Sequence, residues 1–472
     1  MLSISDGSVR MCDGLRRREA IRVGGLSALG LSLPQLLSER TAGAVDQPNT
    51  GTSHLPSFGK AKSVILFWLL GGPPQHESWD PKPDAPENIR GEFGAIDSIV
   101  PGIRVGELMP LTSRHTDKLA VLRAVVTKDQ AHSSSGYQML TGVPHEPLSS
   151  ENVTAKAPNL WPSWGAIVRA LRPDRNGLPS AITLPRHIAN DGEIVWPGQD
   201  AGFLGRKFDP WLLNCDPSEA DFRIPEISLA PGIDDTRLNV RRDLLRELDH
   251  RQQHLETSLR IRRYTQQTQQ AFTLVTGKGA RDAFSVSAES EHVRDRYGRN
   301  RFGQSVLMSR RLVEAGASLV QVNWTRVAGA DNNGTWDTHK NHCASLKNPL
   351  MPMMDQTFSA LLEDLDQRGM LDETLVAWLG EFGHTPKING NAGRDHWGNC
   401  FSLALAGGGI KGGVVHGESD AHAAYPVSGI VTPRDIAATI FHCLGYVPET
   451  QIHDQFARPI QISRGEVIEA VL

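Results

Sequence analysis

Short apolar runs recur along the chain, and glycine or a group of polar residues follows several of them. The runs cover residues 63–70, 119–126, 318–324, 375–379 and 401–406. Apolar runs of this length, bounded by turn residues, are typical of strands that are buried on both faces of a sheet. We therefore expect these runs to form the centre of one sheet.

Segments typical of helices lie between the apolar runs. They cover a stretch that ends at Gly142, and residues 158–173, 301–315, 349–369 and 432–445. Gly142 is placed to end a helix, and Pro433 after Thr432 is typical of a helix start. Residues 234–272 predict one or two further amphipathic helices with charged outer faces. Strands that alternate with helices predict an α/β fold with a mostly parallel central sheet and helices on both faces.

Composition and charge narrow the functional classes. The 472 residues are 39% hydrophobic and 22% charged, with a net charge of −4. This is the composition of a globular protein, and no basic excess points to nucleic acid as a partner. The five cysteines are scattered without a CxxC pair. They therefore indicate neither a zinc knuckle nor a disulfide framework.

The N-terminal segment has the pattern of an export signal. Basic residues at 16–22 precede an apolar stretch at 23–37, and small residues at 42–44 follow. A short amphipathic surface helix is the alternative. The arginine pair resembles a twin-arginine signal. We expect residues 1–44 to be the signal, 45–60 a linker and 61–472 one domain, exported to the periplasm or cell surface without a permanent membrane span.

Carboxylates and imidazoles gather just after three of the predicted strands. They are His76 and Glu77 after the first strand, Asp337 and His339 after the strand at 318–324, and Glu381, His384, Asp395 and His396 after the strand at 375–379. Ligands of open α/β sheets bind beyond the carboxyl ends of the strands. Each group alone fits an ordinary polar loop, whereas three groups at three strand ends favour one site for a divalent metal.

Two other features follow predicted strands. Gly71 and Gly72 let the backbone approach a ligand closely, although a plain tight turn is the alternative. His132 and Ser133 precede a predicted helix, where amides and hydroxyls hold an anion or simply cap the helix. The number of imidazoles favours Zn²⁺ or Mn²⁺ over Ca²⁺ or Mg²⁺ as the metal.

The order of these passages resembles that of the alkaline phosphatase and sulfatase superfamily, and more closely that of the DUF1501 family. The passages that carry the resemblance are residues 71–83, 132–142, 198–205, 336–339 and 381–397. The resemblance implies an alkaline-phosphatase-like fold and metal-assisted displacement at phosphorus or sulfur. His132 stands at the position of the superfamily's Ser, Thr or formylglycine nucleophile, and Leu70 and the glycines after it stand where the superfamily has an Asp.

The resemblance thus implies an exported, metal-dependent hydrolase of sulfate or phosphate esters, acting on a small molecule or a polysaccharide. His132 and Ser133 would be catalytic, and Gly71, Gly72 and Asp395 would bind substrate. The metal ligands would be Asp337, His339, Glu381, His384, His396, Glu77 and His76. Because the usual nucleophile and the first-strand Asp are missing, the alternative is a non-catalytic protein of the same fold that binds an anion, a glycan or a protein.

Overall fold

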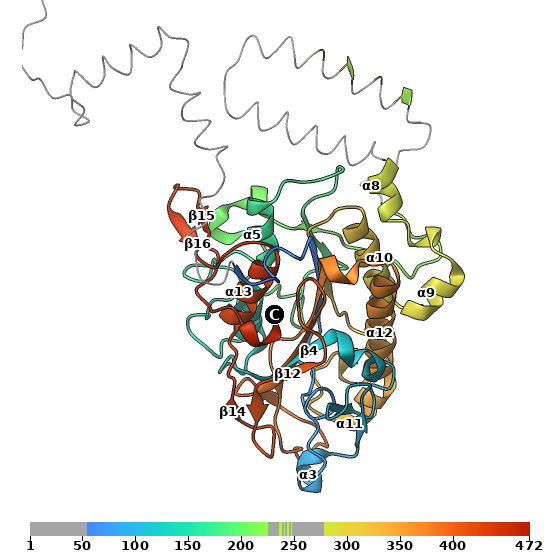
Figure 1. The fold of residues 1–472 in the computed structure, drawn as a ribbon, viewed down its shortest axis with the longest axis vertical. Coiled ribbons are helices and arrows are strands. Elements are labelled where there is room, and N and C mark those ends of the chain that lie inside the picture. Colours follow the sequence, from blue (N-terminus) through green and yellow to red (C-terminus); the bar gives the residue numbers. More distant parts are fainter. Residues whose placement is uncertain (1–53, 225–235, 238–239, 241–242, 245–246, 248–277) are drawn as a thin grey trace, which may run out of the picture. The chain divides into compact units, whose positions relative to one another are not determined.

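The computed structural model describes residues 54–224, 236–237, 240, 243–244, 247 and 278–472 (Figure 1). Its largest element is an eight-stranded sheet in the order β12-β4-β11-β8-β1-β7-β5-β6. The strands are β1 Ser63–Trp68, β4 Leu119–Val125, β5 Ala181–Leu184, β6 Trp211–Leu212, β7 Leu319–Asn323, β8 Thr374–Leu379, β11 Phe401–Ala406 and β12 Val414–His416.

The sheet is mostly parallel, as the sequence predicts. β1 pairs in parallel with β7 and β8, and the parallel pairing continues through β5 to β6. β12 is parallel to β4. β11 lies between β4 and β8 and is antiparallel to both. The carboxyl ends of β4, β8, β1 and β7 therefore meet at the same edge of the sheet.

The apolar runs form strands because both faces of the sheet are covered. Every residue of β1, β7, β8 and β11 is buried. The five predicted strands are all present, and their ends differ from the predicted ones by at most two residues. β5, β6 and β12 were not predicted, because two to four residues give no clear periodicity.

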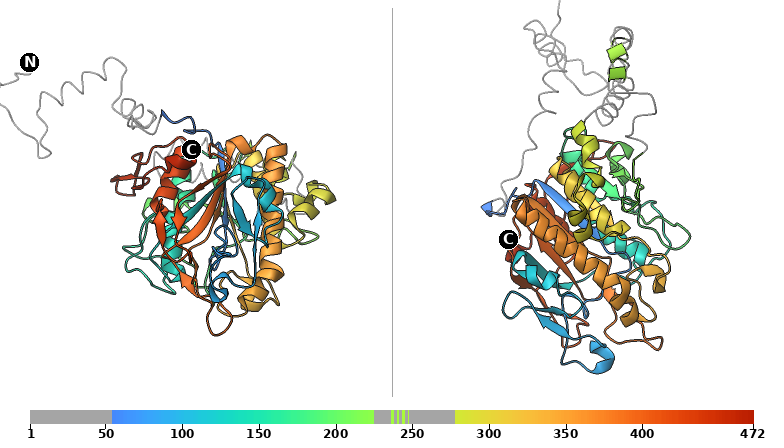
Figure 2. Two further views of the ribbon diagram at one scale, coloured as in Figure 1. Left: turned by 60° about the horizontal axis from the view of Figure 1, so that its bottom comes forward. Right: turned by 90° about the vertical axis from the view of Figure 1, so that its right-hand side faces the viewer.

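Helices cover both faces of the sheet, which confirms the predicted layers (Figure 2). α10 (Arg301–Glu314) and α12 (Met351–Gln367) pack together on one face. α4 (His132–Thr141), α5 (Trp164–Leu171) and α13 (Pro433–Cys443) lie on the other. A capping box between Thr432 and Asp435 begins α13, and Gly142, in the left-handed conformation with φ 75°, ends α4.

Shorter helices and strands lie outside the main sheet. The helices are α3 Glu87–Arg90, α8 Lys278–Ala283, α9 Glu291–Tyr297 and α11 His342–Ser345. The two-stranded ribbons join β2 Ala95–Asp97 to β3 Arg104–Gly106, β9 Gly383–His384 to β10 His396–Trp397, β13 Glu418–Ser419 to β14 Pro426–Ser428, and β15 Gln451–His453 to β16 Pro459–Gln461. The ribbon of β9 and β10 carries two of the predicted site residues.

Some predictions fall on residues outside the described part of the chain. These are the export signal at 1–44, most of the linker at 45–60 and most of the amphipathic segment at 234–272. Among the helices that the structure does describe, none combines the length and the apolar character that a membrane crossing requires.

Candidate metal centre

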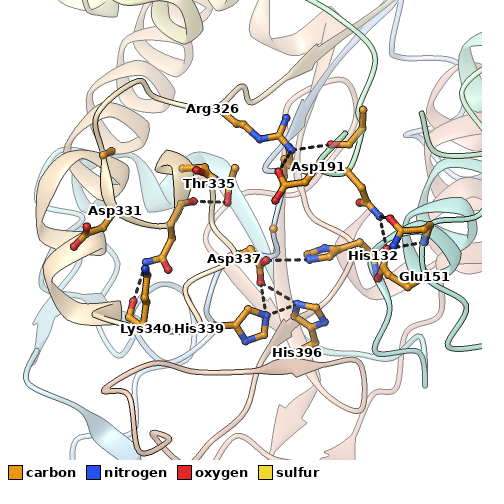
Figure 3. Close-up of a pocket in the computed structure, with 18 of the residues that line it drawn as sticks. His132, Glu151, Asp191, Arg326, Asp331, Thr335, Asp337, His339, Lys340 and His396 are labelled. Atoms are coloured by element: carbon orange, nitrogen blue, oxygen red, sulfur yellow. Dashed lines mark hydrogen bonds and ion pairs between the residues drawn. The ribbon is translucent and has the colours of Figure 1, made fainter. Parts of the chain in front are cut away.

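Three imidazoles converge on one carboxylate beyond the carboxyl ends of the strands (Figure 3). The Nε2 of His132 lies 3.3 Å from Asp337 Oδ2. The Nε2 atoms of His339 and His396 each lie 2.9 Å from Asp337 Oδ1. His132 is the first residue of α4, His396 begins β10, and Asp337 and His339 lie in the loop after β7. The strand order thus brings together residues that are far apart in the sequence.

The outer nitrogen of each imidazole meets an oxygen acceptor. These contacts join His132 Nδ1 to Glu381 Oε1 at 2.9 Å, His339 Nδ1 to Asp395 Oδ1 at 2.8 Å, and His396 Nδ1 to the Gln130 carbonyl at 2.7 Å. Because ionised carboxylate and carbonyl oxygens only accept hydrogen bonds, each Nδ1 carries the hydrogen. A neutral imidazole in this tautomer directs its Nε2 lone pair at Asp337.

Lone pairs that face an anionic oxygen require a proton or a cation between them. Without a metal, protons fill this role: burial alone would lower the pKa of His132, but hydrogen bonds to Asp337 and Glu381 raise it to about 10. The hydrogen bond to Asp337 raises the pKa of His339 to about 9. Burial would raise the pKa of Asp337, but its imidazole partners hold it far below the usual range.

The same donor set fits a divalent metal. One atom from each of His132, Asp337 and His396 lies within 4.8 Å of the others, and His339 Nε2 lies 3.0 Å from His396 Nε2. Imidazole nitrogens with a carboxylate oxygen suit Zn²⁺ or Mn²⁺. Metal-bound histidines commonly donate their other N–H to a carboxylate or a backbone carbonyl, as all three do here. The identity of the metal remains a prediction.

Glu381, Gly71 and Gly72 pack against the residues of the centre. Glu381 is fully buried, and its Oε1 also accepts a 2.7 Å hydrogen bond from the Gly71 amide. Gly71 has φ +109°, and a Cβ there would lie 2.2 Å from the Asp337 amide nitrogen. A Cβ on Gly72, at φ +79°, would lie 2.7 Å from Phe382. Both positions therefore require glycine for close packing, and Gly71 also lines the cavity.

Ser133 lies beside the centre but is engaged elsewhere. α4 begins at His132, without a side-chain cap, so the serines stand inside its first turn rather than before the helix. The Ser133 hydroxyl is buried and donates to Glu151 Oε1 at 3.1 Å. Glu151 Oε2 accepts from the His132 amide at 2.7 Å, so a carboxylate of the chain already occupies this helix start.

His76, Glu77 and His384 form a separate buried group. None of the three makes a hydrogen bond or ion pair with Asp337 in the described part of the chain. Glu77 Oε1 accepts from Arg394 Nη2 at 2.6 Å, and His76 Nε2 lies 2.8 Å from the His422 carbonyl oxygen. His384 is fully buried, and neither of its ring nitrogens has a hydrogen-bond partner among the described residues. Burial lowers the pKa of His384, which keeps it neutral.

A cavity of about 710 Å³ opens over the centre. Its polar walls come from the loops after β5, β7 and α4, and include Glu151, Asn190, Asp191, Arg326, Asn332 and Lys340. Arg326 Nη2 donates to Asp191 Oδ1 at 2.7 Å, which links two walls of the cavity. Arg326 and Lys340 carry the positive charge of the cavity wall, and Glu151, Asp191 and Asp331 carry negative charge there (Figure 3).

The sequence pattern gave no sign of several residues that shape the site. Gln130 acts through its backbone oxygen, which no side-chain pattern reports. Arg326 and Glu151 lie in loops without periodicity. Asp395 stands next to a predicted ligand, and its contact with His339 makes it the partner of an imidazole. The nearby Arg394 is fully buried, which is rare for arginine and has no local signature.

Comparison with known proteins identifies the family of the chain and a few solved structures of low sequence identity. No curated protein matches the chain. Among solved structures, the lipoteichoic acid synthase LtaP from Listeria monocytogenes shares 10% identity at a TM-score of 0.39, over 90% of this chain and 79% of that one. Ps i-CgsB shares 11% identity at a TM-score of 0.39, over 81% and 72%. The PsFucS1 sulfatase from Pseudoalteromonas sp. shares 13% identity at a TM-score of 0.37, over 82% and 68%.

Likeness at this level is too loose to transfer an activity to this chain. The family assignment rests on the sequence instead. The model described as "Protein of unknown function (DUF1501)" matches residues 61–472, which confirms the resemblance of the sequence to that family. The chain therefore belongs to the DUF1501 family.

Proposed function

We propose that this protein is a metal-dependent hydrolase of sulfate or phosphate esters. The observation that carries the proposal is the convergence of three imidazole Nε2 atoms on Asp337, while an acceptor holds each Nδ1. This arrangement, at the carboxyl edge of a parallel sheet and open to a cavity, supports a catalytic centre rather than a structural one.

His132, Asp337 and His396 would hold the metal, with His339 beside them. A divalent metal bound there would supply positive charge that stabilises the negative charge developing on the ester oxygens and lowers the pKa of water. The side chains of the cavity would bind the ester and transfer the proton. Arg326 and Lys340 attract the ester anion into the cavity by their positive charge. The Arg326 guanidinium then releases the Asp191 carboxylate and binds the ester anion in its place.

His339 is the imidazole best placed to carry a proton. It lines the cavity, and its side chain is 44% exposed, against 13% for His132 and 17% for His396. Asp395 holds its Nδ1–H at 2.8 Å, so its Nε2 is the atom that takes up or returns a proton. The N-terminal pattern supports export, which would place the substrate, a small molecule or a polysaccharide ester, outside the cytoplasm.

The test is turnover by protein that is purified without chelator and loaded with Zn²⁺ or Mn²⁺. The substrates are p-nitrophenyl sulfate, p-nitrophenyl phosphate, bis-p-nitrophenyl phosphate and sulfated oligosaccharides. We expect hydrolysis of at least one class, loss with chelator or Asp337→Asn, and retention in the control Asp372→Asn, whose carboxylate is exposed before β8. Metal-loaded protein that hydrolyses none of them would refute the proposal.

The second candidate is a non-catalytic binding protein of the same fold. It is favoured by the imidazole of His132 at the usual nucleophile position and by the engagement of the neighbouring Ser133 hydroxyl with Glu151. Saturable binding of sulfate or of a sulfated glycan, with no turnover by the metal-loaded protein, would support it.

A further inference from the structure

The hydroxyl groups nearest the centre are all engaged with other acceptors. The serines of α4 are fully buried: Ser133 donates to Glu151 at 3.1 Å, Ser134 to Asp129 at 2.8 Å, and Ser135 to the Glu381 carbonyl at 2.6 Å. Other donors also use the two carboxylates, since Glu151 accepts from the His132 amide and Asp129 from Gln138. None of the three serines lines the cavity over the centre. A serine in this turn is therefore unsuited to attack an ester.

The cavity wall offers no better nucleophile. Among the described residues that line it, Thr335 carries the one hydroxyl, which donates to the Asn332 carbonyl at 3.0 Å. No cysteine lines this cavity within the described chain. Thr338, in the same loop, is buried, and its hydroxyl lies 2.6 Å from the Nδ1 of His342, whose Nε2 lies 3.3 Å from Glu77 Oε2.

The three imidazoles remain as candidate nucleophiles, and in each of them Nδ1 meets an acceptor while Nε2 faces Asp337. His132 stands at the position that the resemblance implies for the nucleophile, and its contacts show the conflict. Nδ1 contacts Glu381 at 2.9 Å, and Nε2 faces Asp337 at 3.3 Å. The ring is also packed against Trp196, at 5.7 Å between centroids and an interplanar angle of 23°. Attack by Nε2 on an ester would remove its lone pair from the centre that His132 helps to form. A ligand and a nucleophile are thus competing uses of one atom.

From these contacts we infer that water, and not a side chain, displaces the ester in a single step. The water oxygen donates a lone pair to phosphorus or sulfur as the bond to the ester oxygen breaks. One proton of the water ends on the leaving alkoxide, so ester and water give alcohol and phosphate or sulfate. The reaction then passes through no covalent enzyme intermediate. This inference rests on the proposed function and adds the route to it.

Stereochemistry at the reacting atom tests the route. A single in-line displacement inverts the configuration, whereas two displacements through a covalent enzyme intermediate retain it. The probe is the Rp isomer of methyl p-nitrophenyl phosphorothioate, hydrolysed in H₂¹⁸O by the metal-loaded protein. If only sulfate esters are turned over, the probe is a sulfate monoester made chiral with ¹⁶O, ¹⁷O and ¹⁸O, and the configuration is read on the new sulfate ester that an added alcohol forms in place of water. We expect inversion, and inversion again in any turnover by Ser133→Ala.

Retention of configuration would overturn the inference and leave the proposed function intact. In that case, denaturation of the protein during turnover of a ³²P-labelled ester would also leave label on the chain, and acid-labile label would place it on a histidine. Absence of turnover with every ester class would instead refute the proposed function, and the inference with it. The two failures are therefore distinguishable.

Discussion

The ion pair between Arg394 and Glu77 offers a sharp test of how the interior supports the centre. Both side chains are buried, at 0% and 1% exposure, and Arg394 Nη2 lies 2.6 Å from Glu77 Oε1. Arg394 also donates to backbone carbonyls of residues 89, 385 and 386. It thereby ties the loop after β1 to the segment that carries Asp395 and His396. We predict that Arg394→Met strongly destabilises the protein.

The magnitude follows from burial. At 2.6 Å and an effective dielectric constant of about 20, the Coulomb attraction is about 6 kcal/mol. Burial would raise the pKa of Glu77, and Arg394 is the largest influence that holds it below the usual range, so removing Arg394 leaves a buried carboxylate without its main partner. Leaving one charge of a buried pair unpaired typically costs about 3–5 kcal/mol. We expect a loss in that range for Arg394→Met.

Urea unfolding of the metal-free protein measures this loss. Lys62 and Glu373 form the matched control, because their ion pair has the same 2.6 Å separation but side chains that are 71% and 50% exposed. Lys62→Met should cost at most about 1 kcal/mol. The double variant of Arg394→Met with Glu77→Gln should lose less than the sum of the single changes. Equal losses for Arg394→Met and Lys62→Met would refute the reasoning.

Three further predictions follow from individual contacts. Glu381→Gln removes the charged acceptor of the His132 Nδ1–H, so metal affinity should fall about 10- to 100-fold in a competition titration. Asp395→Asn removes the carboxylate that orients the His339 imidazole, so kcat on the best ester should fall while metal content stays unchanged. An unaltered kcat would argue against a role of His339 in proton transfer. Burial lowers the pKa of His442 from its ordinary 6.5 to about 4. The unfolded chain therefore takes up the proton first as the pH falls from 6.5 to 4, and about 3 kcal/mol of stability is lost in that window. His442→Leu should show a shallower acid loss in urea unfolding between pH 7.5 and 4.5.

The fold was largely predictable because its signals are local. Buried parallel strands need continuous apolar runs, and those at 63–70 and 375–379 stand out by themselves. Helix ends were also readable, since Gly142 and Pro433 have defined backbone requirements. The direction of β11 was not predicted, because an apolar run between two turns fits either orientation. Short strands such as β5 lacked enough residues to show a pattern.

The site was predictable in its residue types but not in its contacts. The sequence brought Asp337 and His396 to strand ends, and the strand order then placed them 2.9 Å apart. Which carboxylate faces an Nε2 and which holds an Nδ1 depends on loop conformation. Glu381 and Asp395 were therefore assigned as metal ligand and substrate contact, whereas the structure places both on imidazole Nδ1 atoms. Whether Glu381 also reaches a metal stays a prediction.

The measurement that tests the central claim most directly is metal content by mass spectrometry. Wild type, His396→Ala and the control His453→Ala, whose ring is exposed on β15, are purified without chelator and soaked with Zn²⁺ or Mn²⁺. We predict stoichiometric metal in wild type and His453→Ala, and its loss in His396→Ala. No metal in wild type, or equal metal in all three proteins, would contradict the account.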